Sequence, residues 1–447
     1  MMAARRAPIC DFVKRYEKSG TLRLHMPGHK GRTLIGPEGM DLTEIRGADS
    51  LFEADGIIAE SEANASALFG ARTFYSVEGS SLCIRTMLAL IARNVPQRGE
   101  KTRVLAARNV HKSFLSAVAL LDVEVDWLYP TVEESYLSCT VTAEGLERAL
   151  AACTEKPAAV YITSPDYLGN VADVKALAAV CHAHGVYLLV DNAHGAYLKF
   201  LAGSAHPIDL GADLCCDSAH KTLPVLTGGA YLHVSHTVEA LFADKVKATM
   251  ALFASTSPSY LILQSLDAVN PYLVEHGGDF AVFAARVAIC RSRLEKYGFV
   301  FVGNEPLKWT IATKSYGYTG MEFADVLRKH GIECEFADPD HVVMMLSPAI
   351  SSHLNHCCRI LAGVPRRAPL VQAPPRLQTA TRALSPREAL LSPAEVLPVA
   401  QCLGRILADA TVGCPPAVPI LVCGERINEA AIQAFLYYGT ERCSVVK

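Results

Sequence analysis

The sequence predicts an α/β protein with a large, mainly parallel sheet, followed by a smaller α+β domain. Between about residues 71 and 271, short apolar runs typical of buried strands alternate with segments whose apolar residues have helical spacing. From about residue 272 this rhythm changes to a helix rich in Ala and Arg, followed by short strands. At 447 residues, the chain also exceeds the length at which a single core usually stops growing.

The major domain is expected to begin after an irregular arm, residues 1–70, which is dense in glycine, proline and charge. Its strands are expected at residues 73–77, 103–107, 123–128, 158–163, 186–190, 212–217 and 229–234. Its helices are expected at residues 80–92, 112–121 and 174–183. We place this domain at residues 71–271.

The second domain, residues 272–447, is expected to hold a mixture of helices and short strands. Helices are predicted at residues 280–297 and 399–410, and strands at residues 308–313, 341–346 and 419–422. Residues 364–398 carry many prolines, and we expect an extended connection there.

Composition excludes several classes of protein. The chain is 51% hydrophobic and 19% charged with a net charge of -3, which gives no sign of nucleic-acid or anionic-membrane binding. Its 15 cysteines include no CxxC pair, and the start, Met1–Arg6, lacks the apolar segment of a secretory signal. We therefore expect reduced thiols, a cytoplasmic protein and, from the high apolar content, an oligomer interface.

Lys221 is the most informative residue. It follows the buried strand 212–217, where a lysine is easily desolvated, and a lysine whose pKa falls in this way can form a Schiff base. Asp191 ends the strand before it. Pyridoxal phosphate needs this pair, since the lysine binds its aldehyde and the acid keeps its pyridine nitrogen protonated. The alternative is two unrelated polar residues at strand ends.

A phosphate site is predicted where Gly79, Ser80 and Ser81 follow a strand and open a helix. Glycine lets the backbone approach an anion, and the hydroxyls and free amides of a helix start can bind phosphate. The alternative is an ordinary serine helix cap. The lysine and the acid favour the phosphate interpretation.

Three further polar segments are candidates for the same site. His111 follows another strand, where it could stack on a pyridine ring or be merely structural. Ser255 and Thr256 belong to a hydroxyl cluster that could equally cap a helix. The segment His25–Gly31 could be a rigid site loop, a solvated turn or, as a lesser alternative, part of a zinc site.

These segments together resemble the Orn/Lys/Arg decarboxylases, the fold-type I pyridoxal-phosphate family that acts on basic amino acids. The matching segments are, in order, residues 25–31, 41–44, 68–71, 77–81, 108–113, 191–195, 218–224, 255–260, 385–389, 414–419 and 424–425. The compact length resembles the short, biosynthetic arginine-decarboxylase branch, which lacks an added N-terminal regulatory domain.

The resemblance implies the roles of the site residues. Lys221 would hold the cofactor aldehyde, Asp191 would pair with the pyridine nitrogen and His111 would stack on the ring. The implied catalytic residues are Lys221, Asp191, His111, His220 and His194. The implied cofactor-binding residues are Gly79, Ser80, Ser81, His111, Asp191, His194, Ser218, His220, Lys221, Ser255 and Thr256. Ser255 and Thr256 would reach the phosphate of a neighbouring subunit, so the active unit would be at least a homodimer; no metal is implied.

The implied reaction is decarboxylation of a basic amino acid in polyamine biosynthesis, with arginine to agmatine favoured over lysine or ornithine. Either His220 or Lys221 would protonate Cα. Departures from the family pattern are Asn192 for Glu, Ser80 for Thr, Ala417 for Gly and Cys423 for Pro. The alternatives are another fold-type I enzyme, an aminotransferase or lyase, and a non-catalytic homologue.

Overall fold

The computed structural model of the chain describes residues 5–96, 99–130, 135–376, 378–409 and 416–447. The structure divides into two compact units, each built from two separate stretches of sequence. Unit 1 comprises residues 1–96 and 174–281, and unit 2 comprises residues 97–173 and 282–447.

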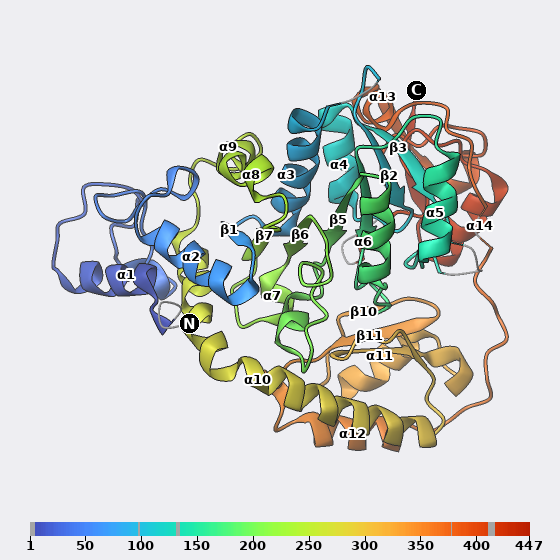
Figure 1. Cartoon of the computed structure of the whole chain (residues 1–447). Coiled ribbons are helices and arrows are strands. Elements are labelled where there is room, and N and C mark those ends of the chain that lie inside the picture. Colours follow the sequence, from blue (N-terminus) through green and yellow to red (C-terminus); the bar gives the residue numbers. More distant parts are fainter. Residues whose placement is uncertain (1–4, 97–98, 131–134, 377, 410–415) are drawn as a thin grey trace. The chain divides into compact units, whose positions relative to one another are not determined.

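Unit 1 contains four sheet strands that lie side by side (Figure 1). Their order is β1 (Arg72–Ser76), β7 (Ala230–Val234), β6 (Leu214–Asp217) and β5 (Tyr187–Asp191). β5 and β6 are parallel, with Asp191 opposite Cys216, whereas β7 is antiparallel to both of its neighbours. β1, β6 and β5 therefore run in one direction, and their carboxyl ends lie at one edge.

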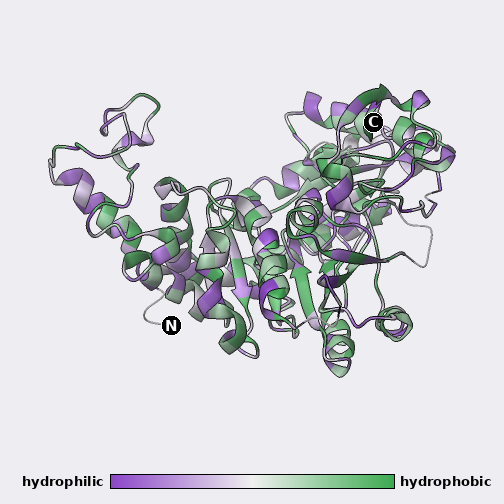
Figure 2. Ribbon diagram, turned by 90° about the horizontal axis from the view of Figure 1, so that it is seen from above, coloured by the Kyte–Doolittle hydropathy of each residue, from purple (hydrophilic) through white to green (hydrophobic). Residues whose placement is uncertain are grey.

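The helices of unit 1 pack on these strands or on one another. They are α1 (Pro8–Lys18), α2 (Ile57–Phe69), α3 (Gly79–Asn94), α6 (Val174–Ala183), α7 (Ala219–Thr222), α8 (Glu239–Phe242) and α9 (Val246–Met250). α3 packs on β6 and β7, and α2 packs on β1. The strands are almost wholly buried, and Figure 2 shows the hydrophobic residues gathered along them. The 37-residue helix α10 (Tyr260–Lys296) leads from unit 1 into unit 2.

Unit 2 contains three parallel strands and two smaller antiparallel sheets. The parallel strands are, in order, β4 (Ala159–Thr163), β2 (Arg103–Ala107) and β3 (Glu124–Leu128). The antiparallel sheets are β10 (Phe336–Ala337), β11 (His341–Met345), β9 (Lys308–Ala312) and β8 (Phe301–Val302), and the pair β12 (Ala394–Pro398) and β13 (Arg442–Val446). Its helices are α4 (Lys112–Leu121), α5 (Ala143–Ala152), α11 (Gly320–Lys329), α12 (Leu354–Gly363), α13 (Pro386–Leu391) and α14 (Glu429–Tyr437).

The predicted fold class, a mainly parallel sheet with a smaller α+β part, is confirmed. The division into residues 1–70, 71–271 and 272–447 stays a prediction. Among the described residues, none of the helices is both long enough and apolar enough to cross a membrane.

Five local predictions were wrong. The connection expected to be extended at 364–398 contains helix α13, which the Ser385 capping box starts, and strand β12. The arm contains helices α1 and α2, because apolar residues such as Ile9 and Val13 give α1 a buried face. The helix expected at 280–297 begins at Tyr260. The helix expected at 399–410 is a single 3-10 turn, Val399–Gln401, with Ala410 outside the described residues. The apolar run 419–422 forms no strand; Ile420 and Leu421 are buried in a side-chain cluster instead.

A buried carboxylate, Asp267, ties α1 to α10. Its two oxygens accept hydrogen bonds from Cys10 N at 2.9 Å and from Ser61 Oγ at 2.6 Å. Ser61 Oγ also lies 2.8 Å from the hydroxyl of Tyr75, to which Asn270 donates. Burial raises the pKa of Asp267 to about 6, in spite of these donors.

Candidate active site

Two carboxylates stand at the same edge of the unit 1 sheet, because β5 ends at Asp191 and the parallel strand β6 ends at Asp217. Asp191 is 2% exposed. One of its oxygens accepts from Ala193 N at 3.2 Å and from Cys216 Sγ at 3.6 Å. These contacts hold the Asp191 carboxylate in one orientation at the strand end.

Lys221 lies in α7, the single helical turn that follows β6. Its Nζ is 3.1 Å from Nε2 of His194, which the chain places three residues after Asp191. The neighbouring His220 is bonded twice to Gly229 O, by its backbone N at 3.1 Å and by ring Nδ1 at 3.0 Å. Because a carbonyl oxygen only accepts, Nδ1 of His220 carries the proton. The structure thus brings Asp191, His194, His220 and Lys221 to one sheet edge.

The predicted phosphate segment opens helix α3 (Gly79–Asn94). Gly79 has a φ of +70°, a left-handed conformation that glycine adopts without strain. Ser218 Oγ, from the segment before Lys221, donates to Ser80 Oγ at 2.8 Å, and Ser81 belongs to the same first turn. Hydroxyls from two elements therefore meet at the amino end of a long helix, which is a suitable place for a phosphate.

The Ser255–Thr256 segment is exposed and lies beside the start of α3 in the same chain. Ser255 N donates to Glu78 Oε1 at 2.7 Å, and Glu78 directly precedes Gly79. The Glu78 carboxylate therefore holds this loop near the candidate phosphate site. That the two hydroxyls reach the phosphate of a neighbouring subunit stays a prediction.

His111 belongs to unit 2, where it is the N-cap of α4. Its Nδ1 accepts from Ser113 N at 3.1 Å, which is the contact of a helix-capping side chain. The next amide, Lys112 N, donates to Ala417 O at 2.8 Å. Ala417 has a φ of +57°, a left-handed conformation that favours glycine. Stacking of His111 on a cofactor ring stays a prediction.

Two family segments that are far apart in the sequence meet in unit 2. Arg108 Nη2 lies 2.8 Å from Glu425 Oε2, and Glu425 is almost completely buried. The same Oε2 accepts from Val422 N at 2.8 Å. Both charged residues line a cavity of about 900 Å³ in this unit. Of the matching tail segment 414–419, Cys414 and Pro415 lie outside the described residues, as do Met1–Ala4 of the start.

The histidines of the His25–Gly31 segment have separate partners. His25 Nε2 is 2.6 Å from the Tyr16 hydroxyl, and His29 Nε2 is 3.3 Å from Asp41 Oδ2. His29 Nδ1 also accepts from Gly31 N at 3.0 Å. Each ring is thus used in local hydrogen bonds, which favours the structured-loop interpretation over a shared zinc ion.

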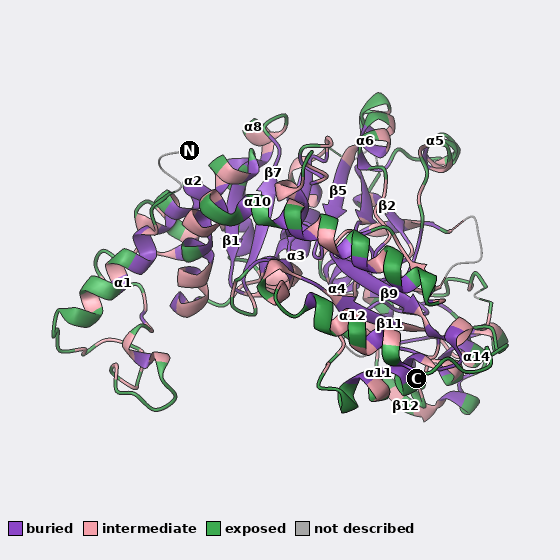
Figure 3. Ribbon diagram, turned by 90° about the horizontal axis from the view of Figure 1, so that it is seen from below, coloured by how far each residue is buried: buried purple, intermediate pink, exposed green. Residues whose placement is uncertain are grey.

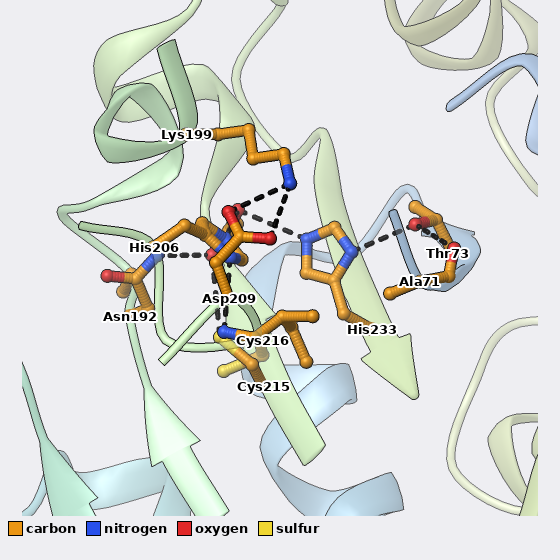
Figure 4. A network of polar contacts seen from close by, with 12 residues as sticks. Ala71, Thr73, Asn192, Lys199, His206, Asp209, Cys215, Cys216 and His233 are labelled. Atoms are coloured by element: carbon orange, nitrogen blue, oxygen red, sulfur yellow. Dashed lines mark hydrogen bonds and ion pairs between the residues drawn. The ribbon is translucent and has the colours of Figure 1, made fainter. Parts of the chain in front are cut away.

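Sequence reasoning missed a buried carboxylate, Asp217, directly before Ser218. It accepts from Asn192 Nδ2 at 2.7 Å, His206 Nε2 at 3.0 Å and His233 Nε2 at 3.1 Å. Figure 4 labels these three partners. Burial opposes ionisation, but the two histidines lower the pKa of Asp217 far below its usual value. Burial in turn lowers the pKa of His233. The sequence did offer one signal for Asp217, namely an acid at the end of an otherwise apolar strand. The spacing of the residues along the chain could not predict its two histidine partners.

The described residues fit pyridoxal phosphate. A fixed carboxylate, an amine in contact with an imidazole, and a hydroxyl-lined helix start are the groups that bind its pyridine nitrogen, aldehyde and phosphate. They come from the ends of β5, β6 and β1, the edge where open α/β sheets bind ligands.

Comparison with known families agrees with this geometry. Residues 7–281 match the model of the Orn/Lys/Arg decarboxylase major domain, and residues 374–442 match that of the Orn/Lys/Arg decarboxylase C-terminal domain. The chain is 30% identical to arginine decarboxylases of Halalkalibacterium halodurans and Bacillus subtilis, with 96% of this chain and 93% of each relative covered.

Solved structures show the same fold. Lysine decarboxylase A from Pseudomonas aeruginosa superimposes with a TM-score of 0.79 at 17% identity, covering all of this chain and 81% of that one. The Francisella novicida lysine decarboxylase gives a TM-score of 0.78 at 18% identity, covering 99% of this chain and 81% of that one.

Proposed function

The chain belongs to the Orn/Lys/Arg decarboxylase family, and from this premise we propose that it converts arginine to agmatine with pyridoxal phosphate as cofactor. Decarboxylation of a basic amino acid follows from the family. Arginine is favoured because four of the relatives that match over almost the whole chain are arginine decarboxylases. Polyamine biosynthesis and a cytoplasmic location belong to the same proposal.

One observation carries the proposal: Asp191, Lys221 and the start of α3 are held at one edge of the unit 1 sheet. Lys221 would bind the cofactor aldehyde and later reclaim it from the product. Asp191 would keep the pyridine nitrogen protonated, and Ser80, Ser81 and Ser218 would bind the phosphate. When bound, the cofactor accepts the electron pair of the broken bond between Cα and the carboxylate, and carbon dioxide leaves.

The residues of the chain would then handle the proton that Cα needs. Lys221 and His194 are 3.1 Å apart, so a proton can pass between Nζ and Nε2. His220 is held by two bonds to Gly229 O and is the other candidate donor. Whichever group donates must be reprotonated from solvent, since each turnover replaces one carboxylate on Cα with one proton.

We also propose that the active unit is a homodimer or a multiple of it. The segment after α1 carries large apolar side chains that are strongly exposed: Leu22, Leu24, Met26, Leu34 and Ile35. Figure 3 shows this segment extending from unit 1 with little buried surface. An exposed apolar arm of this kind needs a partner surface, and a second copy of the chain would supply it.

Product analysis tests the function. The purified protein loaded with pyridoxal phosphate is expected to release carbon dioxide from arginine faster than from lysine or ornithine, with agmatine as product. Lys221→Ala is expected to abolish this release, whereas Lys175→Ala, which alters an exposed lysine on α6, is expected to leave it unchanged. Transfer of the amino group without carbon dioxide would favour the aminotransferase alternative, and unchanged turnover in Lys221→Ala would refute the assignment.

A further inference from the structure

The buried Asp217 network lies outside the residues assigned to cofactor or substrate. Asp217, His206 and His233 are fully buried, and both imidazole Nε2 atoms contact the same oxygen, Asp217 Oδ2. The other oxygen, Oδ1, accepts from Asn192 Nδ2 at 2.7 Å. Each carboxylate oxygen is therefore used, and the network ends on Asn192, the residue that follows Asp191.

Two histidines and a carboxylate could suggest a metal site, but the hydrogen bonds indicate that both histidines donate to the carboxylate. We call Asp217, His206 and His233 the Asp217 clamp. His206 Nδ1 lies 3.4 Å from Ile208 N, an amide that can only donate. Nδ1 of His206 is therefore the acceptor, and its proton sits on Nε2, facing Asp217. His233 Nδ1 has Thr73 Oγ1 at 2.9 Å as its own partner. An ionised carboxylate only accepts, so Nε2 of His233 also carries a proton, and Nε2–H groups rather than lone pairs point at Asp217.

Asn192 connects this clamp to the candidate active site through a tight turn. Its carbonyl accepts from Gly195 N at 2.8 Å, and its own N donates to Cys216 O at 2.9 Å. The turn 192–195 carries Ala193 N, which bonds to Asp191, and His194, which contacts Lys221 Nζ. A Cβ at position 195 would overlap the Asn192 side chain, so glycine is required there for Asn192 to reach Asp217.

We propose that Asp217, held by His206 and His233, is a positioning residue that anchors Asn192 and so sets the orientation of Asp191 at the strand end and of His194 toward Lys221. This inference rests on the proposed function. Asp217 and Asn192 would act through Asp191 and His194 and would not themselves touch cofactor or substrate. Glutamate at position 192 would place a second carboxylate against the buried Asp217 anion, whereas the Asn192 amide supplies the donor that this anion needs.

Asn192→Asp tests the anchor, because it replaces the donor with an acceptor. Two carboxylates in contact repel each other unless they share a proton, and at pH 8 taking up that proton costs free energy. At pH 8 we expect kcat to fall about 10- to 100-fold, as for a misplacement of roughly 1 Å, with KM changed less than about threefold. The dissociation constant of pyridoxal phosphate from the protein should rise at least about fivefold. Both losses should shrink as the pH falls, because the shared proton restores a hydrogen bond.

The exchanged pair Asn192→Asp with Asp217→Asn restores a matched donor and acceptor. This double variant is expected to recover cofactor affinity and kcat at pH 8 to within about tenfold of the wild type, while each single variant stays impaired. Asn94→Asp is the matched control, since it makes the same change at the end of α3 and should behave as the wild type. If Asn192→Asp does not fold, Asn192→Ala removes the anchor without adding charge and is expected to lose kcat about tenfold or more.

Several results would overturn the inference: wild-type cofactor affinity and kcat in Asn192→Asp at pH 8, wild-type behaviour of Asn192→Ala, or a double variant no better than the worse single one. Failure of the proposed function is distinguishable from these. In that case the wild type would bind pyridoxal phosphate but release no carbon dioxide, and the comparison of cofactor affinities would still decide whether the network positions Asp191 and His194.

Discussion

Replacing Asp267 with asparagine is expected to change how stability depends on pH. In the folded protein, burial raises the pKa of Asp267 from 3.8 to about 6. The native state therefore binds more protons than the unfolded state between about pH 4 and pH 6. Stability from this group is fully present below pH 4 and is lost as the pH rises through about 6. In total, Asp267 contributes about 3 kcal/mol to the free energy of unfolding. About 1.3 kcal/mol of this contribution is lost between pH 5 and pH 7.

An asparagine side chain cannot titrate, so the Asp267→Asn variant should lack this contribution. The amide nitrogen of the new side chain cannot accept from Cys10 N, so the variant loses one bond that ties α1 to α10. The measurement is urea unfolding at pH 5 and pH 7 for both proteins, with Asp244→Asn as an exposed control. The drop in unfolding free energy from pH 5 to pH 7 should be about 1.3 kcal/mol larger in the wild type. An identical drop in both proteins would refute the raised pKa of Asp267.

Three further predictions follow from the site and the fold. Asp191→Asn should keep the fold but lose about 100-fold or more in turnover, because each lost pK unit of stabilisation is worth about 1.4 kcal/mol; a rate within a few-fold of the wild type would place the pyridine partner elsewhere. Mixing Lys221→Ala subunits with subunits mutated at Ser255 and Thr256 should restore some activity, whereas a fully active monomer in sedimentation would exclude shared sites. Ala417→Val should lose about 2 kcal/mol or more of stability, because a β-branched residue is strained at a φ of +57°, while Ala417→Gly should stay within about 1 kcal/mol of the wild type in urea unfolding.

Much of the sheet could be predicted because its strands are short apolar runs with a polar residue at the carboxyl end. The strand ending in Asp191 and the helix Lys112–Leu121 agree closely with the structure, since local periodicity reports burial directly. The same reasoning failed for residues 419–422. There the apolar side chains are buried by packing without a paired strand, and sequence alone does not separate these cases.

The Asp217 clamp could not be predicted, because its members become neighbours only through the sheet. β6 and β7 are antiparallel partners, and that pairing places Asp217 opposite Tyr231, on the strand that also carries His233. His206 comes from a loop before β6. No periodicity joins these residues, and a lone buried histidine reads as an ordinary core residue. Lys221 and Asp191 could be predicted because each lies at or just after the end of one apolar run, and a lysine or an acid at that place indicates its chemistry without knowledge of the strand pairing.

The interleaving of the two units has a consequence for how the chain folds during synthesis. Because unit 1 takes residues from both sides of an insertion, β1 leaves the ribosome well before its hydrogen-bonded neighbour β7. At typical elongation rates β1 waits roughly 10 to 30 seconds with an unpaired edge. Unit 2 is completed later still, because β12 pairs with β13, which is synthesised after β7. A late stop codon that removes Arg442–Val446 would release a nascent chain whose β12 has lost its only strand partner among the described residues.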